Sequence, residues 1–188
     1  MLWVKEYPFN MPDYFQDVCR EFLENNEPED SNQYESVQDS KMWLIWNHNR
    51  YHSPKLVDIR KQILETTGAN LEYDKGFTAI WRYDENFPQC PIHIDGAGYN
   101  DKGEPGERKH NGSICTSLTG TFKLHLHHQD TEEIVETVEI TDKKLVVLNN
   151  TVYPHSVQGQ GDLIVFGIDL QSDPEEFFAG ESPNVRLV

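Results

Sequence analysis

The chain has 188 residues, with 16 Lys or Arg against 32 Asp or Glu, so its formal net charge is −16. This length suits one domain with its own core, and we expect a single domain over residues 1–188. Such a surface repels phosphate backbones, which disfavours nucleic acid as a partner. No apolar run approaches the roughly 20 residues of a membrane-spanning helix, so we expect no membrane association.

The cysteines indicate the compartment. Cys19, Cys90 and Cys115 are odd in number and widely spaced, which is neither a disulfide framework nor a zinc-binding pattern. Free thiols favour a reducing compartment, and the N-terminus lacks a charged-then-apolar signal pattern. The sequence therefore predicts a cytoplasmic protein, while its oligomeric state stays open.

Residues 1–75 are expected to form a buttress of helices and one strand. Apolar residues at helical spacing predict an amphipathic helix over 12–26, and a short apolar run predicts a buried strand over 42–46. Pro54 follows Ser53, a pair that suits the cap and first turn of a second helix. Gly68 is expected to end that helix.

From residue 76 the pattern changes to strands and turns, with an irregular tail over 171–188. Helices followed by many strands are typical of a β-barrel or sandwich buttressed by helices. We therefore expect a mainly β fold whose core spans residues 76–170.

Two polar residues alternate with apolar ones in the run Ile92-His93-Ile94-Asp95. On a strand, alternate residues point to the same face, so His93 and Asp95 would enter one cavity while Ile92 and Ile94 pack behind.

A second histidine, His155, lies 62 positions after His93. Buried strands are expected over 144–148 and 163–166, which places His155 in a loop between two core strands. Two imidazoles and a carboxylate can occupy one face of an octahedral iron site and leave the other positions open. A His-x-Asp tripeptide alone is weak evidence, since short motifs often occur by chance.

The loop over residues 99–112 leaves directly from the His93–Asp95 pair. Loops of this length inside compact domains are usually functional or disordered. We interpret it as a lid over the cavity.

The segments over 81–95 and 145–157 resemble the two metal-binding blocks of 2-oxoglutarate/Fe(II)-dependent dioxygenases, in the prolyl-hydroxylase-like and oxidative-demethylase-like branches. The resemblance covers roughly residues 76–170 in short motifs. It implies a double-stranded β-helix (a jelly-roll, cupin-like core), Fe(II), 2-oxoglutarate and oxygen. It also implies that His93, Asp95 and His155 bind iron and that Tyr83 binds the co-substrate.

The chain departs from this family in one respect. Members usually carry an Arg or Lys on the strand after the distal histidine, which pairs with the far carboxylate of 2-oxoglutarate. Residues 161–169 contain no basic residue. Lys123 on an earlier strand is the first substitute and Arg82 the second, although Lys123 on a solvated face and Arg82 in a structural ion pair are the alternatives.

Two further histidines, His125 and His127, share one face of the strand that carries Lys123. They face either the cavity, where they could contact substrate, or solvent.

The resemblance thus predicts hydroxylation, or demethylation through hydroxylation, of an unknown small molecule or peptide. Two alternatives remain. The first is a cupin-type metalloenzyme that does not use 2-oxoglutarate, and the second is a non-catalytic binding module on the same scaffold.

Overall fold

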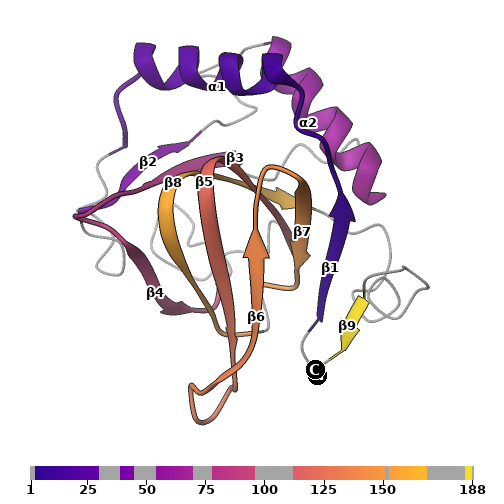
Figure 1. Ribbon diagram of the computed structural model, residues 1–188, viewed down its shortest axis with the longest axis vertical. Helices are drawn as coiled ribbons and strands as arrows, with labels where there is room; N and C mark the ends of the chain where they lie inside the picture. Colours follow the sequence, from indigo (N-terminus) through magenta and orange to yellow (C-terminus); the bar gives the residue numbers. More distant parts are fainter. Residues whose placement is uncertain are drawn as a thin grey trace, which may run out of the picture.

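A computed structural model describes residues 3–29, 39–44, 54–69, 78–95, 112–150, 153–168 and 185–187. This part of the chain contains nine β strands and two α helices. Both helices lie together on one side of a strongly bent sheet (Figure 1). The predicted mainly β fold with flanking helices is confirmed.

Both predicted helices form close to their expected bounds. Helix α1 spans Asp13–Asn25 and α2 spans Pro54–Thr67. Gly68, with φ of 72°, follows α2 directly, as expected for a glycine that ends a helix in the left-handed conformation. Neither is long and apolar enough to cross a membrane, within the part of the chain that the structure describes.

The strands follow one another along the chain as β1 (Trp3–Pro8), β2 (Lys41–Leu44), β3 (Thr78–Tyr83), β4 (Gln89–His93), β5 (Gly112–His127), β6 (Ile134–Ile140), β7 (Lys144–Leu148), β8 (His155–Ile168) and β9 (Val185–Leu187). Predicted strands at 42–46, 144–148 and 163–166 all correspond to observed strands. The tail predicted as irregular includes β9, which pairs with β1.

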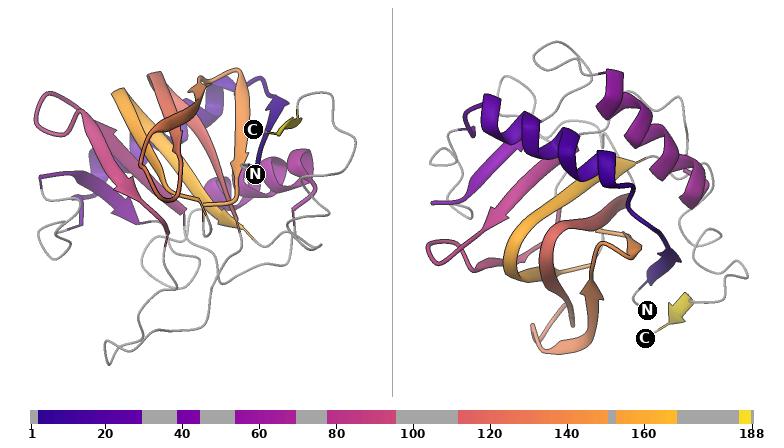
Figure 2. Two further views of the ribbon diagram at one scale, coloured as in Figure 1. Left: turned by 90° about the horizontal axis from the view of Figure 1, so that it is seen from below. Right: turned by 45° about the horizontal axis from the view of Figure 1, so that its top comes forward.

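The bent sheet forms two layers that face each other. Strands β5 and β8 connect these layers, because each strand is long enough to take part in both. Their halves near Ile114 and Ile164 lie in a sheet of order β2-β3-β8-β5-β7-β1-β9. Their other halves pair with β6 and β4, which lie off this path. The sheet thereby folds over itself as a double-stranded β-helix, with the two helices crossing over one face (Figure 2).

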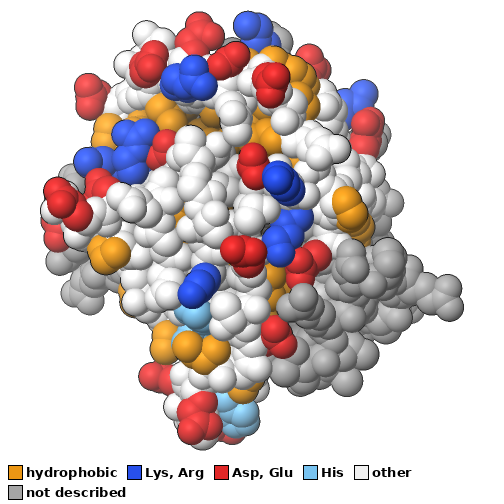
Figure 3. All heavy atoms as spheres, viewed as in Figure 1, with side chains coloured by type: hydrophobic (Ala, Val, Ile, Leu, Met, Phe, Trp, Pro, Cys, Tyr) orange, Lys and Arg blue, Asp and Glu red, His pale blue; other side chains and the backbone are white. Residues whose placement is uncertain are grey.

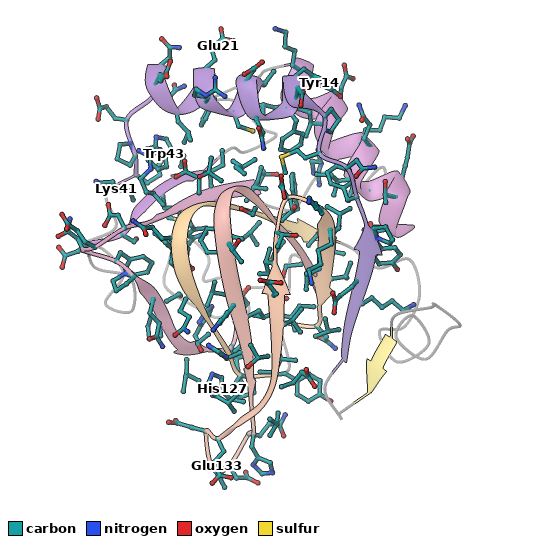
Figure 4. The ribbon with its side chains drawn as sticks, in the orientation of Figure 1. Tyr14, Glu21, Lys41, Trp43, His127 and Glu133 are labelled. Atoms are coloured by element: carbon teal, nitrogen blue, oxygen red, sulfur yellow. The ribbon has the colours of Figure 1, made fainter. Side chains whose placement is uncertain are left out.

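Two apolar cores result from the alternation of side chains along these strands. On β7, Leu145 and Val147 face the helices, whereas Val146 and Leu148 face inward. The helix-side core combines α1, α2 and the outer face of the larger sheet, and Trp43 lies there between β2 and α1 (Figure 4). The barrel core fills the space between the layers and comprises mainly Val4, Tyr83, Phe87, Cys90, Cys115, Phe122, Leu124, Leu126, Val138, Ile140, Val146, Leu148, Val157 and Leu163.

Two predictions about local structure are wrong. His155 is not in a loop: it is the first residue of β8, which continues through Gly159 and Gly161 to Ile168. Ile92 and Ile94 do not pack behind the ligand pair, since they are 38% and 47% exposed. Both helices cover the larger sheet, so nothing from α1 or α2 covers the outer side of β4.

Charged groups are distributed over the surface. Acidic and basic side chains are interspersed across the coloured part of the face in Figure 3. The expected lid over residues 99–112 lies outside the described residues, except for Gly112, where β5 begins.

Gly120 and Gly161 are cross-strand partners where β5 and β8 pass from one layer to the other. Both have positive φ, 79° and 123°. A Cβ on Gly120 would overlap the Gln160 carbonyl, and one on Gly161 would overlap the Thr119 carbonyl. The crossover therefore needs glycine for backbone conformation and for close approach.

We expect Gly120→Ala to lower the free energy of unfolding by about 3 kcal/mol, because left-handed strain and a backbone clash act together. Gly68→Ala is the matched control: its φ is also positive but no atom lies within 4 Å of the added Cβ. It should cost about 1 kcal/mol. Urea unfolding measures both, and equal losses would show that the close approach is unimportant.

Candidate metal centre

The two expected histidines meet where β4 ends and β8 begins. His93 is the last residue of β4 and is the cross-strand partner of His155. Their ring centroids are 4.3 Å apart. Pairing of these strands thus brings together two side chains that are 62 positions apart in sequence.

Asp95 completes the group from just beyond β4. Its backbone N–H donates to the carbonyl oxygen of Asn150 at 2.9 Å, which ties it to the segment that follows β7. Asp95 Oδ1 lies 3.2 Å from His93 Nε2 and 3.9 Å from His155 Nε2. One ligand atom from each of the three residues lies within 4.8 Å of the other two, close enough for all three to reach one metal ion.

Backbone carbonyls determine which ring nitrogen can bind a metal. His93 Nδ1 lies 2.8 Å from the Pro91 carbonyl oxygen, and His155 Nδ1 lies 3.1 Å from that of Tyr153. A carbonyl only accepts, so each Nδ1 carries the proton and donates it. This leaves the lone pair on Nε2 in the neutral ring, and both Nε2 atoms point toward Asp95.

The site binds one proton without metal. Burial by itself would lower the pKa of His93, but hydrogen bonds to Asp95 and Cys90 outweigh it and raise that pKa to about 11. The pKa of His155 falls to about 4, first because burial penalises its charged form and second because His93 lies close by. A positive charge on His93 thus balances the Asp95 carboxylate.

The second oxygen of Asp95 is also held. Asn150 donates from Nδ2 to Asp95 Oδ2, and Asn150 is only 1% exposed. The sequence analysis did not single out Asn150 and missed this contact. The only available signal was a polar pair directly after a buried strand.

The barrel core adjoins the three residues. Cys90 Sγ lies 3.8 Å from His93 Nδ1. The pKa of Cys115 rises to about 12, first through burial and then through the nearby Asp95 charge. Tyr83, expected to contact a co-substrate, lies in this core, is 3% exposed, and has its pKa raised by burial.

Neither expected cation joins the group. Lys123 is exposed, on the face of β5 opposite Phe122 and Leu124, which point into the barrel core. Arg82 binds Asp162 through two hydrogen bonds of 2.8 and 3.1 Å and lies over the ring of Trp43 on the helix side. Side-chain alternation thus turns both away from the barrel interior.

His125 and His127 also lie away from the group. They share the outer face of β5 with Lys123, although both are buried. His127 bonds to the Glu132 carbonyl oxygen and to Ser156 Oγ, each at 2.8 Å, at the end of β5 that Figure 4 shows near the β5–β6 turn. His125 bonds to Thr137 Oγ1 at 2.9 Å. Their contacts stabilise the smaller layer.

No protein-family model matches the sequence, and no curated protein matches it. Solved structures do. A Pseudomonas putida prolyl-4-hydroxylase aligns with a TM-score of 0.57 at 13% identity, over 91% of this chain and 94% of that one. The chain has the fold of the prolyl hydroxylases. A prolyl hydroxylase from Trichoplax adhaerens, solved with a hypoxia inducible factor oxygen degradation domain peptide fragment, aligns with a TM-score of 0.50 at 13% identity, over 95% of this chain and 87% of that one.

These positions give a prediction for the two cations. Arg82→Ala should lower the free energy of unfolding by about 1 kcal/mol, because it removes the ion pair to Asp162, yet leave Fe(II) affinity unchanged. Lys123→Ala, the matched control, should change neither the free energy of unfolding nor the Fe(II) affinity. Urea unfolding and anaerobic Fe(II) titration measure the two effects. Loss of 2-oxoglutarate binding in either variant would show that the altered residue contacts the co-substrate.

Proposed function

We propose that the protein is a mononuclear Fe(II) oxygenase with His93, Asp95 and His155 as its metal ligands. The observation that carries this is the convergence of one ligand atom from each of these three residues within 4.8 Å, with Asp95 Oδ1 3.2 and 3.9 Å from the two Nε2 atoms. Two imidazoles and one carboxylate are the donor set of non-haem Fe(II) oxygenases. The prolyl-hydroxylase fold supports the same function.

The geometry suits iron in two further ways. Both histidines have Nδ1 bonded to backbone carbonyls, which orients the rings before a metal arrives. Three ligands on one side leave the remaining octahedral positions for other molecules. When bound, Fe(II) would supply the redox chemistry that lets O₂ oxidise a C–H bond, and the apolar barrel core adjoins its ligands.

The described residues do not fit the far carboxylate of 2-oxoglutarate. That carboxylate would need a cation if it were buried in the barrel. The barrel lining is apolar there: Cys115 points inward, and so do Val146 and Val165, the residues that pair with Cys115 on the two neighbouring strands. Lys5 alternates with Val4 and so faces the helix side. Lys144 is ion-paired with Glu6 at 2.7 Å and begins β7, whereas Asn150 follows the opposite end of that strand.

This mismatch favours one second candidate. A cupin-type Fe(II) enzyme that does not use 2-oxoglutarate needs no internal cation, so the same triad and barrel would suffice. We keep 2-oxoglutarate as the first co-substrate to test because of the fold, and derive no catalytic step from it.

Two observations bear on the class of substrate. The Trichoplax neighbour was solved with a peptide, which favours a peptide over a small molecule, with hydroxylation as the outcome. The net charge of −16 disfavours nucleic acid. We further propose a single domain in the cytoplasm, supported by three cysteines that are all free.

Asp95→Ala should reduce Fe(II) affinity by at least 100-fold, since it removes the only anionic ligand. Anaerobic Fe(II) titration measures this, and adding 2-oxoglutarate should produce a visible charge-transfer band in the unaltered protein. Asp130→Ala, which changes an exposed carboxylate on the β5–β6 turn, is the matched control.

Three outcomes separate the candidates. Iron binding with the band supports the 2-oxoglutarate oxygenase. Iron binding without the band supports the cupin-type enzyme. Absence of iron binding in the unaltered protein refutes both and leaves a binding module.

A further inference from the structure

Asn150 makes two separate hydrogen bonds to Asp95. Its backbone carbonyl accepts from the Asp95 N–H at 2.9 Å, and its side-chain Nδ2 donates to Asp95 Oδ2. The first bond fixes the Asp95 backbone and the second fixes its carboxylate.

Chemistry settles the orientation of this amide. An ionised carboxylate has no proton to donate, so Asn150 must turn its nitrogen toward Asp95 and its oxygen away. Asn150 Oδ1 is buried and has no hydrogen-bond partner among the described residues. It lies roughly 5 Å from Asp95 Oδ2, one hydrogen bond plus the width of an amide.

Occupation of Oδ2 limits how Asp95 can bind a metal. Oδ1 is the oxygen that faces both Nε2 atoms, at 3.2 and 3.9 Å, while Oδ2 is held by Asn150. A carboxylate oxygen that already accepts a hydrogen bond is a weaker donor to a metal, so the bond from Asn150 favours metal binding through Oδ1. Single-oxygen binding leaves one more coordination position open than two-oxygen binding would.

We propose that Asn150 is the positioning residue of the metal centre: its Nδ2 holds Asp95 Oδ2, so that Asp95 would bind a metal through Oδ1. This inference rests on the proposed metal ligands.

Mn(II) is a suitable probe, because it accepts nitrogen and oxygen ligands in octahedral geometry. The signal of free Mn(II) in electron paramagnetic resonance gives the affinity. Line broadening in ¹⁷O-enriched water reports how many waters remain on the bound ion. Neither readout depends on turnover.

Asn150→Leu keeps a similar volume and removes both the donor and the acceptor. It should weaken Mn(II) binding about 10- to 100-fold, the range for loss of a residue that supports a metal ligand. It should also reduce the number of bound waters, because Asp95 is then free to bind through both oxygens. If the metal-free variant melts at the same temperature as the metal-free parent protein, its fold is intact.

Ser156→Ala is the matched control. Ser156 is as buried as Asn150, at 1% exposure, and lies beside His155, but its hydroxyl bonds to His127. It should leave both readouts unchanged. If Asn150→Leu does not fold, the smaller Asn150→Ser should fold and shift both readouts in the same direction.

Unchanged affinity and water count in a folded Asn150 variant would overturn this inference and leave the proposed function intact. Equal losses in Ser156→Ala would also overturn it, since any buried polar change nearby would then suffice. Failure of the unaltered protein to bind Mn(II) or Fe(II) would overturn both proposals.

Discussion

Pairing between the end of β4 and the start of β8 is the constraint on which the site depends. The His93–His155 register places both imidazoles side by side, and the bond from the Asp95 N–H to Asn150 brings in the end of β7. The His93–Asp95 segment thereby meets both the segment after β7 and the start of β8 through backbone hydrogen bonds. A shift of one residue in register would turn a histidine to the opposite face, so the strand ladder itself specifies the site.

The helix-side core and the barrel core have different roles in the molecule. The helix-side core stabilises the larger sheet through α1 and α2. The barrel core adjoins the three polar residues through Cys90 and Cys115. Gly120 and Gly161 allow β5 and β8 to serve both layers, so the same two strands contribute to stability on one side and to the site on the other. Changes on the helix side should therefore affect folding before they affect metal affinity.

Sequence patterns predicted local structure well and side-chain direction less well. Helical periodicity gave α1 and α2, and the pattern around His93, Asp95 and His155 identified residues that do converge. Lys123 lies on the outer face of β5, which could not be predicted because alternation alone does not say which face of a strand points inward. Asn150 was missed because its partner is 55 positions away in sequence. The exposure of Ile92 and Ile94 depends on which sheet the helices cover, a property of the whole fold.

Crystals of the protein grown anaerobically with Fe(II) would test the central claim most directly, through an anomalous difference map at the iron edge. The account predicts one strong peak about 2.1 Å from His93 Nε2, Asp95 Oδ1 and His155 Nε2, the usual length of metal bonds to nitrogen and oxygen. A peak elsewhere, or bound by other side chains, would contradict it.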